Sequence, residues 1–377
     1  MAVTFIQQPT SQSIQSSDNP LTFVFSSNQS TQPNFCFIVE TLINGLVVST
    51  DKVFPERGNR AHWDASRIAM TAVKYSPRSP QILTQRSLPT LNVRVAERYG
   101  ITPTTQPFYY SNTILIMKAR CSDEKYQLDW ITDTYTPEYK WLTDCPNQTF
   151  IVSNKHPFYA SILVTSPQLQ LDVFCYDAQG HQLGIITEQD TTTGEVVDIK
   201  ITPQDIATAI SPASIEDVAR LEVYVNQSLP LVVQYIPAEC TEYHQVNWLN
   251  NLGTYDQFLF GHNKDQESAI SALEYKKQFG AWDANNSFQF DPLLSGDTVY
   301  LKTIQLTGTV YTGWISQAYQ HWLAQIYYSI STLLLDQNTT EAIVVTQTQS
   351  SEMKSRFDEL LNFQVSYKKS NFKSITQ

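Results

Sequence analysis

Short runs in which apolar and polar side chains alternate constrain this chain more than any other feature. In the run TLNVRVAERYG, the side chains of Leu91, Val93 and Val95 fall on one face of an extended chain, and those of Asn92 and Arg94 fall on the other. A β-strand places successive side chains on opposite faces, so this pattern predicts a strand with one buried face.

The first group of such runs predicts a β-sandwich domain over residues 20–143. It includes Leu21–Phe25, Asn34–Val48 and Asn112–Cys121. Within the second run, Asn44-Gly45 is the dipeptide typical of a type I′ turn, which joins two antiparallel strands. Several short strands separated by turn signals are typical of a sandwich.

A second group of runs predicts another β-sandwich domain over residues 144–243. Its runs are QTFIVS, LQLDVFCYDAQGHQLGIIT, VVDIKI, RLEVYV and LPLVVQYI. Between them, Thr202-Pro203-Gln204-Asp205 offers an N-cap, a proline at the first helical position and an acid at N3, which predicts one short helix. The matching phrases Thr22–Ser26 (TFVFS) and Thr149–Ser153 (TFIVS) suggest a duplication of the two domains, although unrelated sandwich strands also resemble one another.

The pattern changes after residue 243, and residues 244–377 are predicted to form an α+β domain. Asp265–Gly280 fits a helix that stops at glycine, and the run VYLKTIQLTGTVYTGW fits a long strand. A second helix is predicted from apolar residues at helical spacing, namely Ile315, Tyr319, Trp322, Leu323, Ile326 and Tyr327. Two closing strands complete the prediction, so the chain is mainly β, with two β-sandwich domains followed by a small sheet packed with two helices.

The first nineteen residues are polar, rich in Gln and Ser, and without periodicity. Such a segment buries too little apolar surface to offset the entropy cost of ordering. We therefore expect residues 1–19 to form a flexible arm that becomes ordered on a partner.

The net charge and the cysteine pattern disfavour some classes of partner and cofactor. A net charge of −11 disfavours specific nucleic-acid binding, which requires a positive face against the phosphates. The five cysteines are scattered and never in a C-x-x-C pair, which favours a reducing compartment over disulfides or zinc. The N-terminus lacks the features of a signal peptide and no window is long and apolar enough to span a membrane, so we expect a cytoplasmic protein without membrane contact until it assembles.

Catalytic motifs are missing from the sequence. There is no phosphate loop, zinc-protease or nucleophile-elbow pattern. His244 and His262 could converge with Asp256 and Asp265 on a metal, but ordinary surface or hydrogen-bonded side chains are the favoured interpretation. Asp256 could act as a general acid only beside a second carboxylate, and none is paired with it in the sequence. We therefore expect no enzyme activity, no catalytic residue, no metal and no cofactor.

The segment HQVNWLNNLGTYDQFLFG is predicted to be the entry to the C-terminal domain. Trp248 and Leu249 would end the sandwich region, Leu252-Gly253 would form a turn, and Tyr255–Phe260 would begin the C-terminal sheet. Phe258 and Phe260 share a face at period two and should be core. The remaining side chains are predicted to contact a neighbouring subunit: Trp248, Tyr255, Gln257 and Leu259.

Several phrases of this chain resemble those of virion proteins. NPLTFVFSS, QPNFCFIVETLINGLVVSTDKVFP and HWDASRI in the first third, and WLNNLGTYDQFLF with the Lys-Lys-Gln-Phe-Gly run near the end, are similar to β-sandwich virion proteins of crAss-like phages that infect Bacteroidota. The resemblance covers both ends better than residues 145–240, and it carries no functional residues, because such proteins are recognised by their architecture.

The resemblance implies a structural ring or neck protein in a short-tailed phage. The chain would form a homo-oligomeric ring below the portal, contact portal, ring and tail proteins, and line or surround the DNA conduit in the virion after assembly in the host cytoplasm. Flexible arms, polar-aromatic surfaces and an acidic wall that DNA does not adhere to are consistent with this role. Two alternatives stay open: a receptor- or carbohydrate-binding tail module whose Trp and Tyr rings stack on sugars, and a hydrolase built from distant carboxylates.

Overall fold

The computed structural model confirms a mainly β chain with a small α+β portion. It describes residues 3–73, 82–118, 139–164, 168–191, 195–226, 229–236, 243–276, 280–282, 284–285, 287–290, 297–336, 339–346, 353–354, 361–370 and 373–376. The chain divides into two compact units: unit 1 comprises Met1–Pro237 and Leu249–Gln257, and unit 2 comprises Ala238–Trp248 and Phe258–Gln377. The predicted ranges 20–143, 144–243 and 244–377 stay predictions.

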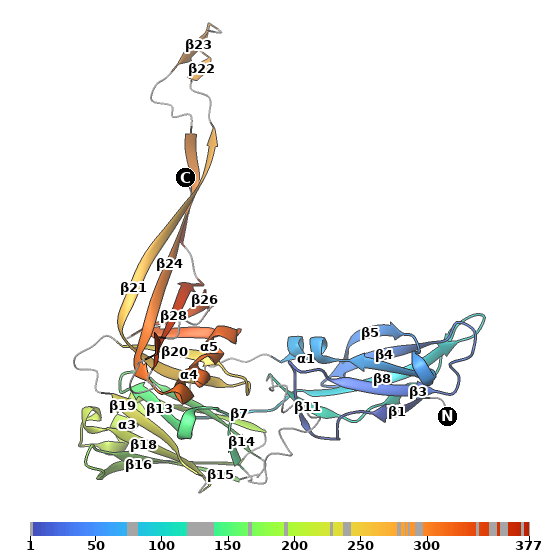
Figure 1. The fold of residues 1–377 in the computed structure, drawn as a ribbon, viewed down its shortest axis with the longest axis horizontal. Coiled ribbons are helices and arrows are strands. Elements are labelled where there is room, and N and C mark those ends of the chain that lie inside the picture. The colour runs from blue at the N-terminus through green and yellow to red at the C-terminus, as the bar shows by residue number, and fades with distance from the viewer. Residues whose placement is uncertain are drawn as a thin grey trace. The chain divides into compact units, whose positions relative to one another are not determined.

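The first sandwich of unit 1 packs two antiparallel-rich sheets face to face (Figure 1). One sheet has the order β1-β3-β6 and contains β1 (Val3–Gln7), β3 (Thr22–Ser27) and β6 (Arg60–Asp64). The other sheet has the order β2-β11-β8-β4-β5. These strands are β2 (Ile14–Ser16), β11 (Ile114–Met117), β8 (Thr90–Tyr99), β4 (Cys36–Ile43) and β5 (Leu46–Val53). Two further short strands, β9 (Thr104–Thr105) and β10 (Tyr109–Tyr110), pair with β8. Short helices follow β5 and β6, η1 (Arg57–Asn59) and α1 (Ser66–Ala72).

The core of this sandwich comes from the alternating runs. Leu91, Val93 and Val95 are fully buried and pack with Phe23 and Phe37 from other strands. The two-residue turn between β4 and β5 has left-handed backbone at both positions, with φ of 49° at Asn44 and 77° at Gly45, as a type I′ turn requires.

The N-terminal segment is not a free arm in this structure, contrary to the sequence prediction. β1 pairs antiparallel with β3, and β2 pairs in parallel with β11. The aromatic ring of Phe5 packs edge-on against Phe25 with 6.0 Å between the ring centroids. Because the backbone groups of this polar segment are paired with strands, it is ordered without a large apolar core of its own.

We expect the isolated protein to resist proteolysis near its N-terminus. Thermolysin cutting before Phe5 or Ile14 requires an extended, accessible backbone, and both residues lie in paired strands. Val3 is only 5% exposed, and burying a carboxylate there is unfavourable. Val3→Asp should therefore detach β1 from β3 and allow thermolysin to cleave the segment. Intact-mass analysis of timed digests checks this, and equally fast N-terminal cleavage of both proteins would favour the flexible arm instead.

The second sandwich of unit 1 is also built from two sheets. The first has the order β12-β14-β17-β7 and contains β12 (Tyr139–Trp141), β14 (Phe158–Val164), β17 (Val196–Ile201) and β7 (Leu83–Arg86). The second has the order β13-β19-β18-β15-β16 and contains β13 (Thr149–Ser153), β19 (Leu231–Ile236), β18 (Arg220–Val225), β15 (Gln168–Tyr176) and β16 (Gln182–Thr191). β7 pairs with β17 and β12 pairs with β14, so two strands of the predicted first domain, 20–143, belong to this sandwich.

The predicted short helix is present as α3 (Pro203–Ile210). The side chain of Thr202 accepts a hydrogen bond from the backbone N–H of Asp205, and the Asp205 carboxylate accepts one from the Thr202 N–H, which forms a capping box. Two 3₁₀ turns, η3 (Pro146–Gln148) and η4 (Ile215–Asp217), complete this region. The two matching sequence segments, Thr22–Ser26 and Thr149–Ser153, have different strand neighbours. β3 has antiparallel neighbours, whereas β13 pairs in parallel with β19.

Unit 2 is built on one large sheet with the order β27-β28-β26-β25-β20-β21-β24-β29. Its strands are β20 (His244–Leu249), β21 (Tyr255–Lys276), β24 (Asp297–Ile315), β25 (Thr332–Asp336), β26 (Thr339–Val345), β27 (Met353–Lys354), β28 (Leu361–Lys369) and β29 (Lys373–Thr376). β24 also pairs with β28, so six of these strands form a closed cycle of pairings. The predicted helical stripe is confirmed from Tyr319 to Tyr327 as two short helices, α4 (Gln317–Leu323) and α5 (Gln325–Tyr328), with Trp322, Leu323 and Ile326 buried, whereas Ile315 ends strand β24.

Two predictions for this region are wrong. Asp265–Gly280 is predicted as a helix, but its part Asp265–Lys276 continues strand β21 and pairs antiparallel with β24, with one register shift between Leu273 and Glu274. In addition, β20 does not end a sandwich, since it pairs with β25 inside the large sheet. The apolar spacing of Ile270 and Leu273 suits a helix, but hydrogen bonding to an adjacent strand decides the conformation of an exposed segment whose own pattern is ambiguous.

Candidate functional site

The predicted contact residues are buried within the chain. Trp248 is fully buried and its ring lies 4.9 Å from that of Trp322, while Tyr255, Gln257 and Leu259 are 5%, 0% and 4% exposed. Phe258 and Phe260 are core, as predicted. Both faces of the strand are covered, so the alternation that normally separates a core face from a free face is absent, and these side chains offer almost no surface to another subunit.

The loop between β20 and β21 is held in unit 1 by a buried polar network. The side-chain amide of Asn250 donates a hydrogen bond to the carbonyl oxygen of Leu142 over 2.9 Å, and the Thr254 hydroxyl donates to the same oxygen over 2.6 Å. The Asn250 side-chain oxygen accepts from the backbone N–H groups of Leu252 and Thr254. This network satisfies polar groups that would otherwise be costly to bury.

Two further residues fix the same segment. Gly253 has a φ of 76°, and a Cβ at this position would stand 1.9 Å from the carbonyl oxygen of Lys118. The Gln257 side chain accepts from the N–H of Tyr159 and donates to its carbonyl oxygen, both over 3.3 Å. These contacts fix Leu249–Gln257 within unit 1.

The geometry does not support a metal site at His244 and Asp256, nor a role of Asp256 as a general acid. The structure describes the side chains of two of the four predicted ligands, and both His244 and Asp256 are buried. No group of three or more His, Cys, Asp or Glu side chains is arranged to hold a metal within the described residues. Burial raises the pKa of the Cys145 thiol, and the nearby Asp256 carboxylate raises it further, so this cysteine is an unreactive thiol.

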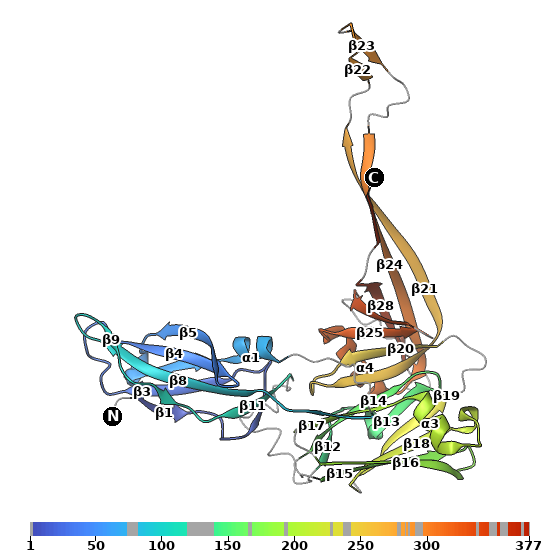
Figure 2. The same ribbon diagram turned by 180° about the vertical axis from the view of Figure 1, so that it is seen from behind.

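A long hairpin in unit 2 is the first candidate assembly surface. The hairpin arm is defined as Asp265–Lys276 of β21 and residues 297–306 of β24, which pair antiparallel along their length (Figure 2). It extends past the closed cycle of strands, and within the described residues β29 pairs with Leu301–Ile304 of this arm. Ile270 and Leu273 on this arm are 65% and 52% exposed. Their partners on β24, Ile304 and Leu301, also pair with β29, so the arm is three-stranded at this point, and exposed apolar side chains on so narrow a sheet are a candidate contact with another chain.

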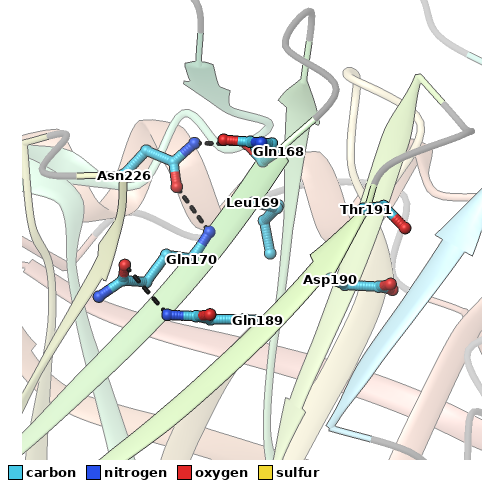
Figure 3. A pocket seen from close by; sticks show the side chains of 7 residues that line it. All are labelled: Gln168, Leu169, Gln170, Gln189, Asp190, Thr191 and Asn226. Carbon is cyan, nitrogen blue, oxygen red and sulfur yellow. Dashed lines mark hydrogen bonds between the residues drawn. The ribbon is translucent and has the colours of Figure 1, made fainter.

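A polar groove in the second sandwich is the second candidate surface (Figure 3). The amide groove has a volume of about 670 Å³ and is lined by Gln168, Leu169, Gln170, Gln189, Asp190, Thr191 and Asn226. Asn226 shapes it, because its side chain accepts from the N–H of Gln170 over 2.5 Å and donates to the carbonyl oxygen of Gln168 over 2.7 Å. Sequence analysis did not identify these residues, although the exposed glutamines alternate with buried leucines along the predicted strand.

No helix in the part of the chain that the structure describes is long and apolar enough to cross a membrane.

Comparison with known proteins does not place this chain in a family. No protein-family model and no curated protein sequence matches it. Among solved structures, a β-glucuronidase from glycoside hydrolase family 2 aligns with 100% of this chain and 36% of its own length, at 8% sequence identity and a TM-score of 0.16. The chain thus spans about a third of that structure, and a TM-score this low carries no inference about fold or activity.

Proposed function

We propose that this chain is a structural virion protein, a subunit of a homo-oligomeric ring in the neck or tail of a short-tailed phage, below the portal. The hairpin arm is the observation that carries the proposal. The resemblance of both ends of the sequence to virion proteins of crAss-like phages supports it independently. Such a subunit mediates head–tail assembly and needs no catalytic residue, metal or cofactor.

The arm has the physical properties of an assembly element. Beyond the Leu301–Ile304 pairing with β29, Glu274–Lys276 and Asp297–Val299 form a ribbon of two strands, and the outer edge of β21 carries backbone groups able to pair with another strand. A neighbouring subunit that covers Ile270 and Leu273 would remove apolar surface from water and add backbone hydrogen bonds. In a closed ring, each subunit can give its arm to the next and receive one from the previous.

Native mass spectrometry of the purified protein tests the proposal. We expect a closed oligomer for the natural sequence, and single subunits for the double variant Ile270→Lys, Leu273→Lys, because two charges at the contact oppose its desolvation. Ile101→Lys is the matched control: Ile101 is 92% exposed in unit 1, and this variant should keep the oligomer. A natural protein that stays monomeric, or a double variant that still forms the same oligomer, would contradict the role of the arm.

A further inference from the structure

The outer face of the sheet that contains β15, β16 and β18 has an unusual composition. The strand registers place Asp172, Phe174 and Tyr176 of β15 on this face, with Ile185 and Thr187 of β16 opposite them. On the other side, β18 contributes Arg220, Glu222 and Tyr224 to the same face. The residues between them, such as Leu171, Val173 and Leu221, are fully buried in the sandwich core. The outer side chains of β15 and β18 are only half-buried, so aromatic rings and polar groups share an accessible surface.

The polar groups on this face are held in place by one another. Asp172 accepts from the Gln170 amide over 2.8 Å and from the Thr187 hydroxyl over 2.9 Å. The Gln189 amide donates to the Gln170 side-chain oxygen over 3.5 Å. Neighbouring side chains thus fix the direction of exposed amide and carboxylate groups, which lowers the entropy cost of binding a ligand.

The aromatic groups are also ordered. The rings of Phe174 and Tyr224 pack edge-to-face with 5.6 Å between centroids, and Arg220 lies over the ring of Tyr176 at 4.9 Å. The Tyr224 hydroxyl donates to Glu222, which is also paired with Arg220. These contacts hold three rings on one face while leaving each of them partly open to solvent.

The face is continuous with the amide groove. Gln170 and Gln189 line the groove, and both also belong to the hydrogen-bonded set that includes Asp172. Figure 3 shows their side chains next to each other, joined by the Gln189–Gln170 hydrogen bond. A ligand lying in the amide groove could therefore extend over the rings of Phe174, Tyr176 and Tyr224 while staying on the same face of this sheet.

We propose that the amide groove and the adjoining aromatic face bind a neutral oligosaccharide. Sugar rings present apolar C–H faces that pack on aromatic rings, and hydroxyls that donate to carboxylate and amide oxygens and accept from amide N–H groups. The local charge selects against acidic sugars, because the face and groove hold three carboxylates, those of Asp172, Asp190 and Glu222, against the single guanidinium of Arg220, which is already paired with Glu222.

Affinity gel electrophoresis tests this. The full-length protein is run in gels containing a soluble galactomannan, a mixed-linkage β-glucan or an α-mannan, and in gels containing the acidic polymer polygalacturonate. We expect at least one neutral polysaccharide to retard the protein and polygalacturonate not to. Phe174→Ala and Gln170→Ala should each weaken binding about tenfold, since one removes a stacking surface and the other a hydroxyl partner.

Tyr328→Ala serves as the matched control, because Tyr328 is 77% exposed but lies in unit 2 and should leave retardation unchanged. Gln170 is exposed, so Gln170→Ala keeps the fold and decides the outcome if Phe174→Ala is unstable. Three results would overturn the assignment: no retardation in any neutral gel, retardation by polygalacturonate alone, or retardation that Gln170→Ala does not weaken. The oligomeric mass, which tests the ring, is measured separately.

Discussion

Replacing Gly253 by alanine is expected to destabilise unit 1 by on the order of 4 kcal/mol, because two unfavourable terms combine. The φ of 76° is left-handed backbone that a residue with a Cβ rarely adopts, and the new methyl carbon would stand 1.9 Å from the Lys118 carbonyl oxygen. The contact is with backbone, so no side-chain rotation relieves it. The loop must move, which disturbs the hydrogen bonds of Asn250 and Thr254 to Leu142.

Gly180→Ala is the matched control for that substitution. Gly180 also has a left-handed φ of 86°, but nothing lies within 4 Å of the position its Cβ would occupy. Gly180→Ala should therefore lower the free energy of unfolding by only about 1 kcal/mol, through backbone strain alone. Urea denaturation followed by circular dichroism measures both. Equal losses for the two variants would show that backbone strain alone accounts for the effect and that the Lys118 contact is not as close as described.

Trp248→Ala is expected to destabilise unit 2 by about 3–5 kcal/mol, as removal of a large buried ring leaves a cavity. Trp248 is fully buried, and its ring contacts that of Trp322, which in turn lies 6.1 Å from Phe258. The lost ring contributes both its own burial and the aromatic packing around it. Thermal unfolding monitored by near-ultraviolet circular dichroism, which reports the packing of aromatic side chains, measures the effect.

Trp314→Ala is the matched control, because it removes the same type of side chain from an exposed position. Trp314 is 60% exposed on β24 of the same unit, and its replacement should change the unfolding free energy by no more than about 0.5 kcal/mol. A Trp248→Ala protein with an unchanged transition would mean that the Trp248 ring is not in the core. That result would restore Trp248 as a surface residue available for a subunit contact.

The local sequence was sufficient where short-range chemistry decides structure. The alternation in Thr90–Tyr99, the Asn44-Gly45 turn and the Thr202 capping box each depend on residues a few positions apart, and all three are present as predicted. The helical spacing around Trp322 is confirmed for the same reason, because Trp322, Leu323 and Ile326 are buried, although Gln320 is buried with them.

Prediction failed where a segment has no single buried face. In Asp265–Lys276, the apolar residues fall on both sides of the strand, and Ile270 and Leu273 are exposed, so no period of two marks the strand. Tyr255–Phe260 is buried on both sides, so the alternation that would identify a free surface is missing there too. In the N-terminal segment, backbone pairing with β3 and β11 orders a polar chain that buries only a few apolar side chains, among them Val3 and Ile14.

The sequence by itself determined a chain of β-strands with one short capped helix, α3, and a helical stripe around Trp322, because the spacing of apolar side chains sets which backbone conformation can bury them. Only the tertiary structure decided which strands pair and which surfaces stay open. The amide groove joins Gln168, Gln189 and Asn226, and the hairpin arm joins β21 to β24, through contacts between residues far apart in the chain. No local pattern encodes such pairings, since they depend on the packing of the whole sheet.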